Sequence, residues 1–500
     1  MFVLCSHYIF YFSPCQVLLL LLIEKISIMQ SNITKKRTDM NNKVPEIMKK
    51  VTNIHFIGIG GVNMYALALA CKKDGYKVTG SDISEGDFTK KLISMGVDVK
   101  YGHAEENLGD AQAVVYNAAI NPDNPEIQAA LKKKIPLIYR ADLLGYLMSK
   151  YKIRIGISGC HGKSTTTSML SHILIKSGID PTVMSGAETD EMSGSFRFGE
   201  GEVFVYEACE YKNSFLHTKP TVSVILNIDY DHADYFDSVE EVTKSFDEFS
   251  KLPYVNKEKN PVVILNVDDE RLLDMSKGLP FSVTFGMYNR DADYLASNFS
   301  QKNGYYTFEI HKNGLNEGTI ELTVPGKHNI YNALAAYAAA DACGVGTEEA
   351  IDALDDFEGT KRRFEYIGSY NGAFVYIDYA HHPSEIEAVI NTARTMTKKK
   401  VIVVFEPHTY SRTKALYDEF IRVLSMADSV ILTDIYPARE TDDLGMSSEK
   451  MSMDIKGACY APVYDSAVSM ARTESEKGDI ILVLGAGTVY KIGKNIVKED

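Results

Sequence analysis

The sequence predicts an α/β protein of three domains, each built around a mainly parallel sheet. Three observations support this prediction. The chain has 500 residues, which is more than one hydrophobic core usually holds. From Thr52 onward, short apolar strands alternate with helical patterns, as they do in parallel α/β sheets. Glycine-rich or polar turns follow several of these strands, at the edge where open α/β sheets bind ligands.

The composition is that of an ordinary enzyme and disfavours nucleic acid as a partner. Hydrophobic residues make up 45% and charged residues 24% of the chain. The net charge is −14, whereas a nucleic-acid binder needs a basic face. An anionic ligand must therefore be held by local sites. The seven cysteines contain no C-x-x-C pair, which favours reduced thiols and a cytoplasmic location over disulfides or a zinc site.

Residues 1–50 are expected to be an extension outside the folded domains. The stretch 1–23 has no charged residue and is long enough to be a signal or transmembrane candidate. It lacks a basic region and a small-residue cleavage site, so we expect a start codon placed too early and no stable membrane anchor. Residues 29–50 are polar and predict a disordered lead-in. Three later methionines precede the first strand: Met29, Met40 and Met48.

Residues 51–150 predict a Rossmann-like domain. The strand around Asn53–Ile57 enters a glycine turn that contains Gly60 and Gly61, and the next strand ends in Asp82, placed to meet a ribose hydroxyl. The dinucleotide fingerprint is imperfect, because Asn63 stands at its third glycine. An NAD-dependent enzyme would need a second catalytic domain, which we do not find. A sugar-nucleotide diphosphate can use the same turn, and Gly61 alone can equally serve tight strand–helix packing.

Residues 151–358 predict a central domain of the P-loop ATPase type. A strand over Lys152–Ser158 enters a glycine turn and a helix leaves it, which is how a chain builds a phosphate cradle. Lys163 supplies a full positive charge, and Ser164 is placed to ligate Mg²⁺. Ile157 stands where the full Walker A pattern has its first glycine, so an ordinary strand-to-helix turn is the alternative. The loop comprises Gly159, Cys160, His161, Gly162, Lys163, Ser164 and Thr165.

Two further apolar strands of this region end in polar residues. Glu207 ends one of them and is suited to the Mg²⁺ of a bound nucleotide, because that ion prefers oxygen ligands. His232 follows the other and could hold a second ion or position a phosphate. Either residue alone is more often a solvated strand end. The preceding phosphate loop favours the functional interpretation.

The remaining candidates lie on a helix and at a domain junction. Asn329 and Asn332 share a helix face and are spaced to bond an adenine edge, although Asn329 would serve equally well as the N-cap. Arg363 could clamp a phosphate across the junction, unless it belongs to a solvated basic turn. Apolar strands within residues 359–500 predict a second Rossmann-like domain.

Taken together, the motifs resemble the Mur ligase family. The resemblance covers about residues 50–490, with the motifs in the family's order and at about its spacing. It implies that the first domain binds a UDP-sugar, the second ATP and the third an amino acid. The motifs are Gly58–Val62, Cys160–Thr166, Glu207–Tyr211, Asn227–His232, Gly326–Asn329 with Asn332, Asp378–Pro383 and Pro407–Thr413.

The resemblance also implies a reaction. ATP would phosphorylate the lactyl carboxylate of UDP-N-acetylmuramate, and L-alanine would attack the acyl phosphate, in peptidoglycan precursor synthesis. Lys163 would hold the β- and γ-phosphates, while Ser164 and Glu207 would hold one Mg²⁺ and His232 a second. Family members carry the remaining roles on the positions of Gly60, Gly61 and Asp82 for the UDP-sugar, Asn329 and Asn332 for adenine, Arg363 for phosphates, and His408 and Arg412 for alanine.

Some departures and alternatives stay open. Thr409 stands where many relatives have an arginine, so the alanine pocket would depend more on Arg412. Asn63 and Tyr65 replace small residues near the sugar-nucleotide turn. The alternative within the family is a recycling ligase that adds a preformed peptide to the same sugar nucleotide. Outside it stand an NAD-dependent enzyme and a catalytically silent binding protein. Cys160 is expected to be a shielded, inert thiol.

Overall fold

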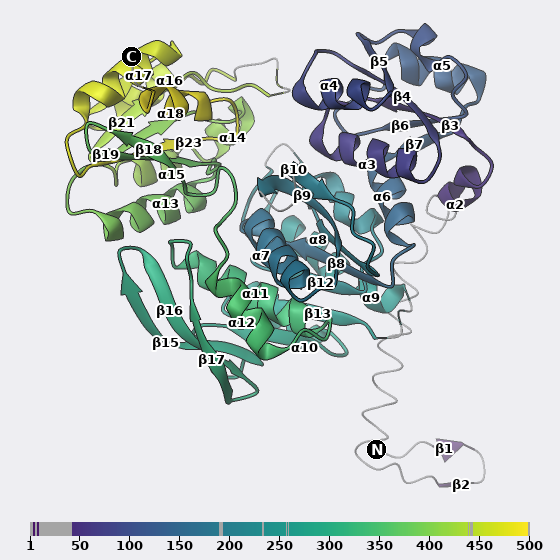
Figure 1. Ribbon diagram of the computed structural model, residues 1–500, viewed down its shortest axis with the longest axis horizontal. Helices are drawn as coiled ribbons and strands as arrows, with labels where there is room; N and C mark the ends of the chain where they lie inside the picture. Colours follow the sequence, from purple (N-terminus) through teal and green to yellow (C-terminus); the bar gives the residue numbers. More distant parts are fainter. Residues whose placement is uncertain are drawn as a thin grey trace.

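The computed structural model describes residues 43–189, 194–232, 235–256, 258, 260–438, 440 and 444–498. It also places two short paired strands, β1 (Leu4–Cys5) and β2 (Tyr8–Ile9). The rest of the expected extension lies outside the described residues. Three sheets follow one another along the chain and form three lobes, with the first and third lobes both seated on the central one (Figure 1). This confirms the predicted α/β architecture.

The expected disorder over residues 29–50 is wrong at its end, because a short helix, α2 (Lys43–Met48), forms there. Val44 and Met48 are four residues apart, lie on one face and are both buried. The hydroxyl of Tyr76 also donates to the carbonyl of Met48 at 3.0 Å. This apolar pair ties the segment to the first domain.

The first domain is a five-stranded, fully parallel sheet in the order β5-β4-β3-β6-β7. The strand order reverses beside β3, which is where doubly wound sheets open a crevice for a ligand. Its elements are β3 (Asn53–Ile57), α3 (Val62–Lys73), β4 (Lys77–Asp82), α4 (Asp87–Ser94), β5 (Asp98–Tyr101), a 3₁₀ turn (Glu105–Leu108), β6 (Ala113–Tyr116), α5 (Pro125–Lys133), β7 (Leu137–Tyr139) and α6 (Arg140–Met148).

The central domain has a ten-stranded sheet in the order β10-β9-β11-β8-β12-β13-β14-β15-β16-β17. The strands β9, β11, β8, β12, β13, β14 and β15 run parallel to one another. At the two edges, β10 is antiparallel to β9, β16 to β15, and β17 to β16. Its first half comprises β8 (Ile153–Ser158), α7 (Lys163–Lys176), β9 (Thr182–Thr189), β10 (Gly194–Arg197), β11 (Val203–Glu207), a 3₁₀ segment (Tyr211–His217), β12 (Val222–Ile225) and α8 (Val239–Ser250).

The second half of this domain supplies a tightly packed helix beside the phosphate loop. Helix α11 is rich in alanine, and its small buried side chains let it pack against α7. The elements are α9 (Leu252–Val255), β13 (Val262–Asn266), α10 (Glu270–Gly278), β14 (Val283–Gly286), β15 (Tyr294–Lys302), β16 (Tyr305–Lys312), β17 (Leu315–Glu321), α11 (His328–Asp341) and α12 (Thr347–Asp355).

The third domain is a six-stranded sheet in the order β18-β19-β23-β20-β21-β22, parallel except for β18. Its elements are β18 (Glu365–Tyr370), β19 (Ala373–Asp378), α13 (Pro383–Met396), β20 (Val401–Phe405), α14 (Tyr410–Ala415), α15 (Tyr417–Leu424), β21 (Ser429–Leu432), α16 (Ser448–Asp454), β22 (Ala458–Tyr460), α17 (Tyr464–Glu474), β23 (Ile480–Leu484) and α18 (Tyr490–Ile496).

Helix α13 lies along the boundary between the central and third domains (Figure 1). Its last residue touches the tip of the β15–β16 hairpin so closely that a Cβ on Gly304 would fall 2.8 Å from Cγ of Met396. The same helix therefore belongs to one domain and packs against the next.

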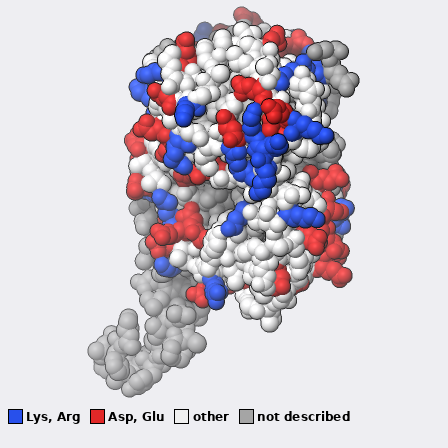
Figure 2. Space-filling model, turned by 90° about the vertical axis from the view of Figure 1, so that its left-hand side faces the viewer, with Lys and Arg blue, Asp and Glu red and all other residues white. Residues whose placement is uncertain are grey.

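The distribution of surface charge and the state of the cysteines agree with what the composition predicts. On the face in Figure 2, basic and acidic side chains lie side by side, and neither sign covers the surface. Among the described residues, no helix is both long and apolar enough to cross a membrane. The described cysteine side chains are free thiols: Cys71, Cys160, Cys209, Cys343 and Cys459.

Candidate active site

The expected phosphate loop has the backbone of a cradle. Gly159 and Gly162 adopt φ of +139° and +85°, a region that favours glycine, and α7 starts immediately afterwards at Lys163. Asn227, after β12, fastens the loop: its Oδ1 accepts from the His161 N–H at 2.8 Å and its Nδ2 donates to the His161 carbonyl at 3.0 Å. The loop is thus held in shape by the neighbouring strand end.

Lys163 forms a buried ion pair with Glu210. Its Nζ lies 3.0 Å from both carboxylate oxygens of Glu210 and 3.2 Å from the Cys160 carbonyl. Burial alone would lower the pKa of Lys163, but the charge of Glu210 raises it overall. Burial likewise opposes ionisation of Glu210, yet Lys163 and His232 hold the pKa of that carboxyl below its usual value. Both groups are charged in the loop.

Sequence reasoning had pointed to Glu207, which the structure places differently from Glu210. Oε1 of Glu207 accepts hydrogen bonds from Ser185 Oγ at 2.8 Å and from the Gly186 N–H at 2.5 Å. Glu207 thus ends β11 on the β9 side, whereas Glu210, three residues later, turns toward Lys163. The only signal for Glu210 in the sequence was a second acid within the same strand-end motif.

His232, expected to hold a second ion or position a phosphate, lies beside the Lys163–Glu210 pair. Its Nε2 lies 3.6 Å from Oε1 of Glu210, and its ring packs against Tyr211 with centroids 4.8 Å apart. Burial would lower the pKa of His232, but Asp231 and Glu210 raise it overall.

A cavity of about 320 Å³ lies between the phosphate loop, α11 and the third domain. It brings together candidate residues from two domains. Among the residues that line it are His161, Gly162, Thr165, Asn329, Asn332, Arg363, Asp378 and Glu385.

The two asparagines of α11 are joined to each other and to α7. Nδ2 of Asn332 donates to Oδ1 of Asn329 at 2.9 Å, and Oδ1 of Asn332 accepts from Thr166 at 3.2 Å. The N-cap of α11 is Lys327, so Asn329 lies inside the first turn and does not cap the helix. Both side chains are buried in the cavity wall.

Arg363 reaches from the third domain onto the phosphate loop. Its Nη2 donates to Oγ of Ser164 at 3.2 Å, and its guanidinium lies 5.0 Å from the ring centroid of Tyr379. Asp378 accepts from the N–H groups of Phe364 and Ala380 at 2.7 and 2.6 Å. Burial nevertheless raises the pKa of Asp378 to about 6.

The glycine turn of the first domain meets the acid that ends β4. The Gly60 N–H donates to Oδ2 of Asp82 at 2.8 Å. A Cβ on Gly60 would fall 2.8 Å from Cγ2 of Thr89 and 2.9 Å from Oδ2 of Asp82. At Gly61 the nearest atom would be 3.5 Å away, an ordinary contact. Close approach therefore requires glycine at position 60, whereas tight packing does not explain Gly61.

Arg412 of the third domain bonds across the domain boundary to Asp231 and lies beside His408 of its own domain. Nε and Nη2 of Arg412 donate to Oδ1 of Asp231 at 3.1 and 2.8 Å, and both side chains are buried. Nη1 of Arg412 lies 3.3 Å from Nδ1 of His408. Thr409 has φ of +68°, and its Oγ1 accepts from the Arg412 N–H at 3.4 Å as the N-cap of α14.

The start of α13 docks onto the phosphate loop and the segment after β12. Nδ1 of His161 lies 3.3 Å from Oε1 of Glu385, and its Nε2 lies 3.0 Å from Oδ2 of Asp229. Burial lowers the pKa of His161, but these two acids outweigh it and raise the pKa to about 9. Oγ of Ser384 donates to the same Asp229 oxygen at 2.7 Å.

One cluster of side chains is close enough to suggest a metal site: His161, Asp229 and His382. Both ring nitrogens of His382, however, already have hydrogen-bond partners. Its Nδ1 accepts from the Ser384 N–H at 3.3 Å, and its Nε2 lies 3.1 Å from the Tyr230 carbonyl. No ring nitrogen of His382 remains for a metal. The cluster is a docking contact between domains.

Cys160 is shielded, in agreement with the sequence analysis. Its Sγ lies 3.2 Å from the Asp229 carbonyl oxygen and 3.1 Å from the Asp229 N–H nitrogen. Burial raises the pKa of this thiol well above its usual value. Cys160 therefore lacks the thiolate character that makes a cysteine reactive.

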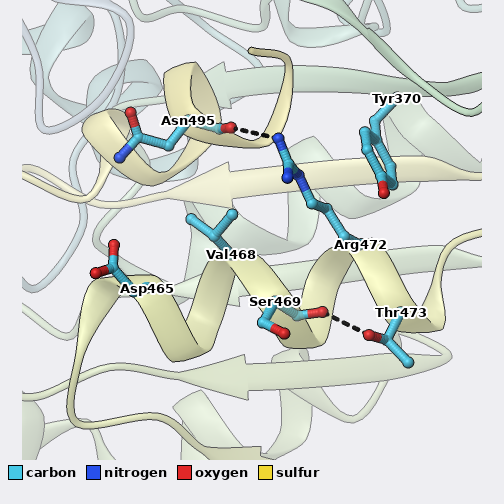
Figure 3. Close-up of a pocket in the computed structure, with 7 residues that line it drawn as sticks. All are labelled: Tyr370, Asp465, Val468, Ser469, Arg472, Thr473 and Asn495. Carbon is cyan, nitrogen blue, oxygen red and sulfur yellow. Dashed lines mark hydrogen bonds between the residues drawn. The ribbon is translucent and has the colours of Figure 1, made fainter. Parts of the chain in front are cut away.

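A second pocket, of about 400 Å³, lies between α17 and α18 in the third domain (Figure 3). Its central side chain is Arg472, which lies 4.7 Å from the Tyr370 ring centroid and donates to the Asn495 carbonyl at 3.1 Å. Arg472 thus caps the C-terminal end of α18. None of the predicted site residues lines this pocket.

Comparison with known proteins assigns the three folded domains to a family. Residues 53–152 match the catalytic domain of the Mur ligase family, 157–340 the Mur ligase middle domain, and 362–487 the Mur ligase glutamate ligase domain. A UDP-N-acetylmuramate–L-alanine ligase of Caldanaerobacter subterraneus subsp. tengcongensis is 42% identical over 460 residues, 91% of this chain and 99% of the relative. A ligase of the same name from Aquifex aeolicus is 41% identical over 456 residues, 91% of this chain and 99% of that one.

Solved structures agree. The UDP-N-acetylmuramate–alanine ligase of Thermotoga maritima has a TM-score of 0.74 at 28% identity and covers 89% of this chain and 98% of its own. The murein peptide ligase of Psychrobacter arcticus shares the fold, with a TM-score of 0.68 at 24% identity over 89% of this chain and 98% of its own. The matched segments account for all three domains, and the chain belongs to the Mur ligase family.

Proposed function

We propose that the protein is an ATP-dependent ligase that joins L-alanine to the lactyl carboxylate of UDP-N-acetylmuramate, a step of peptidoglycan precursor synthesis in the cytoplasm. The observation that carries this proposal is a phosphate loop that borders a cavity through His161, Gly162 and Thr165, with Arg363 of the third domain lining the same cavity and bonding to Ser164 of the loop. Relatives covering nearly the whole chain are named for this reaction. A carboxylate is a poor acyl donor, so its activation by ATP gives the loop its purpose.

Positioning and charge neutralisation are what phosphoryl transfer needs most. Lys163 and the N–H groups at the start of α7 would bind the β- and γ-phosphates. Arg363 would add a second cation from the third domain once that domain is docked. Asn329 and Asn332, which line the same cavity, would face adenine.

The oxygen donors proposed for one Mg²⁺ come from the phosphate loop and from the end of β11. Ser164 offers a hydroxyl and Glu207 a carboxylate, and oxygen donors of this kind suit the ion. Bound there, Mg²⁺ would neutralise phosphate charge. A second ion at His232 fits less well, because Nε2 of the ring already faces Oε1 of Glu210 at 3.6 Å. In this proposal the His232 ring instead supports the Glu210 carboxylate.

The remaining substrates would occupy the other two domains. The UDP-sugar would bind at the turn of Gly60 and Gly61 with Asp82, and L-alanine at His408 and Arg412. Attack of the alanine amine on the acyl phosphate expels phosphate and forms the amide. Docking of α13 onto the phosphate loop would exclude water and protect the acyl phosphate from hydrolysis.

Phosphate release with UDP-N-acetylmuramate, ATP and Mg²⁺ tests this proposal. L-Alanine should stimulate release more strongly than glycine, L-serine or a peptide that begins with L-alanine. Preference for the peptide would show a recycling ligase instead. Absence of any amino-acid-dependent release, or redox turnover with NADH, would overturn the assignment.

A further inference from the structure

The segment Asp229–His232, which follows β12, contacts both halves of the catalytic cleft. Asp229 and the Tyr230 carbonyl bond to the start of α13, Asp231 bonds to Arg412, and His232 lies against Glu210. Four consecutive residues thus connect the third domain to the Lys163–Glu210 pair. Of these contacts, only that of Asp231 reaches a residue assigned to the amino acid.

The geometry of Arg412 shows which of its edges is used. A guanidinium has five N–H donors in one plane. Nε and Nη2 form the side edge, and both donate to Oδ1 of Asp231 at 3.1 and 2.8 Å. Nη1 turns one donor toward His408, whose Nδ1 lies at 3.3 Å and whose carbonyl lies at 3.5 Å. The second N–H of Nη1 and of Nη2 together form the end edge, which can receive a carboxylate through two parallel hydrogen bonds.

Apart from His408, the segment that precedes Arg412 does not fix its guanidinium. Thr409 is uncharged, and its hydroxyl caps α14. A long arginine side chain has many rotamers, so an unanchored guanidinium would lose entropy on each binding event. Asp231 is the acid that anchors it.

We propose that Asp231 is a positioning residue for the amino-acid substrate: it holds the side edge of Arg412 so that the end edge meets the carboxylate of L-alanine. This proposal rests on the role given to Arg412 above. Because Asp231 belongs to the central domain and Arg412 to the third, the alanine site is complete only when the two domains are docked. The same segment carries His232, so the amino-acid site is linked to the phosphate loop through the backbone.

The test is Asp231→Asn in the full chain, with steady-state KM values for all three substrates. Because a hydrogen bond to a charged group is replaced by a weaker one, KM for L-alanine should rise about 10- to 100-fold. KM for ATP and for the UDP-sugar should change less than about twofold, and saturating alanine should restore most of kcat. A loss of positioning predicts that KM rises for L-alanine alone, whereas general damage to the enzyme lowers kcat.

Two further variants keep the test decisive. Tyr417→Phe removes a 2.7 Å bond to Asp454 inside the third domain, away from the docking surface, so KM for L-alanine should stay at the wild-type value. Arg412→Lys keeps the charge but loses the planar edges, and combining it with Asp231→Asn should add little, because the two changes break one interaction.

Three results would overturn the proposal: an unchanged KM for L-alanine in Asp231→Asn, an equal rise in all three KM values, or the same rise in Tyr417→Phe. Additive effects of Asp231→Asn and Arg412→Lys would also contradict it. Failure of the proposed function is a different result, since the wild type would then show no alanine-dependent phosphate release.

Discussion

Both carboxylate oxygens of Glu210 lie 3.0 Å from the ammonium nitrogen of Lys163. The lysine is therefore paired before any phosphate reaches it, and it is aimed by contacts within the protein. A buried cation that is already oriented costs little to reorganise when a substrate charge approaches. Glu210 thereby becomes as important to the loop as the lysine itself.

Lys163→Ala should lower turnover by at least about 10³-fold, the scale on which loss of a cation slows phosphoryl transfer. Binding of the UDP-sugar should be unchanged within about twofold, because Gly60 and Asp82 lie in another domain, and calorimetric titration can measure it. Loss of both properties would contradict the assignment of the two sites to separate domains.

Glu210→Gln should lower stability, whereas Glu207→Gln should raise the Mg²⁺ requirement. Removing the charge of Glu210 leaves Lys163 buried without its partner, which should cost about 3–5 kcal/mol of stability in denaturant unfolding. Glu207 pairs with neutral donors only, so its variant should unfold near the wild type and instead require more Mg²⁺ for half-maximal activity. The reverse pattern would exchange the roles of the two acids.

Gly162→Ala should abolish activity, whereas Gly178→Ala should not. Both positions have positive φ, +85° and +73°, so an alanine costs about 1–2 kcal/mol at either. Only at Gly162 would the new Cβ fall 2.5 Å from Oδ1 of Asn332, while nothing lies within 4 Å of Gly178. Nucleotide affinity and kcat, measured beside unfolding free energies, separate crowding from backbone strain. Equal loss of activity in both would rule out the crowding explanation.

Stability should fall in alkaline solution through His161. Its pKa is raised from 6.5 to about 9 in the fold, so the folded state binds this proton more tightly than the unfolded chain. The resulting stabilisation is complete below the unfolded value of 6.5 and is lost as pH rises through about 9. The difference in unfolding free energy between wild type and His161→Gln should shrink across this window. A constant difference would show that the ring is neutral when docked to Asp229 and Glu385.

Residues at strand ends were the predictable part of the site. Lys163 and His232 follow β-strands whose apolar patterns are plain in the sequence, Asp82 ends another, and carboxyl ends of parallel strands share one edge. Glu210 was not predicted because it shares its strand-end motif with Glu207, and no periodicity beyond the end of β11 indicates which of the two acids turns toward Lys163.

Contacts between domains could not be predicted from the residues alone. Asp231 and Arg412 are 181 positions apart, and their bond depends on how two separately folded sheets pack. Helix α2 was missed for a related reason: its apolar pair stabilises a helix only because the first domain supplies a surface for it.

Helix α13 has a mechanical consequence. It is held near its start by Asp229 and His161 and at its end by the hairpin tip at Gly304. A domain that is held by contacts at both ends of one helix moves most easily by rotating about that helix, since translation would break both sets of contacts at once. The third domain should therefore swing about the long axis of α13 and carry Arg363 and Arg412 with it.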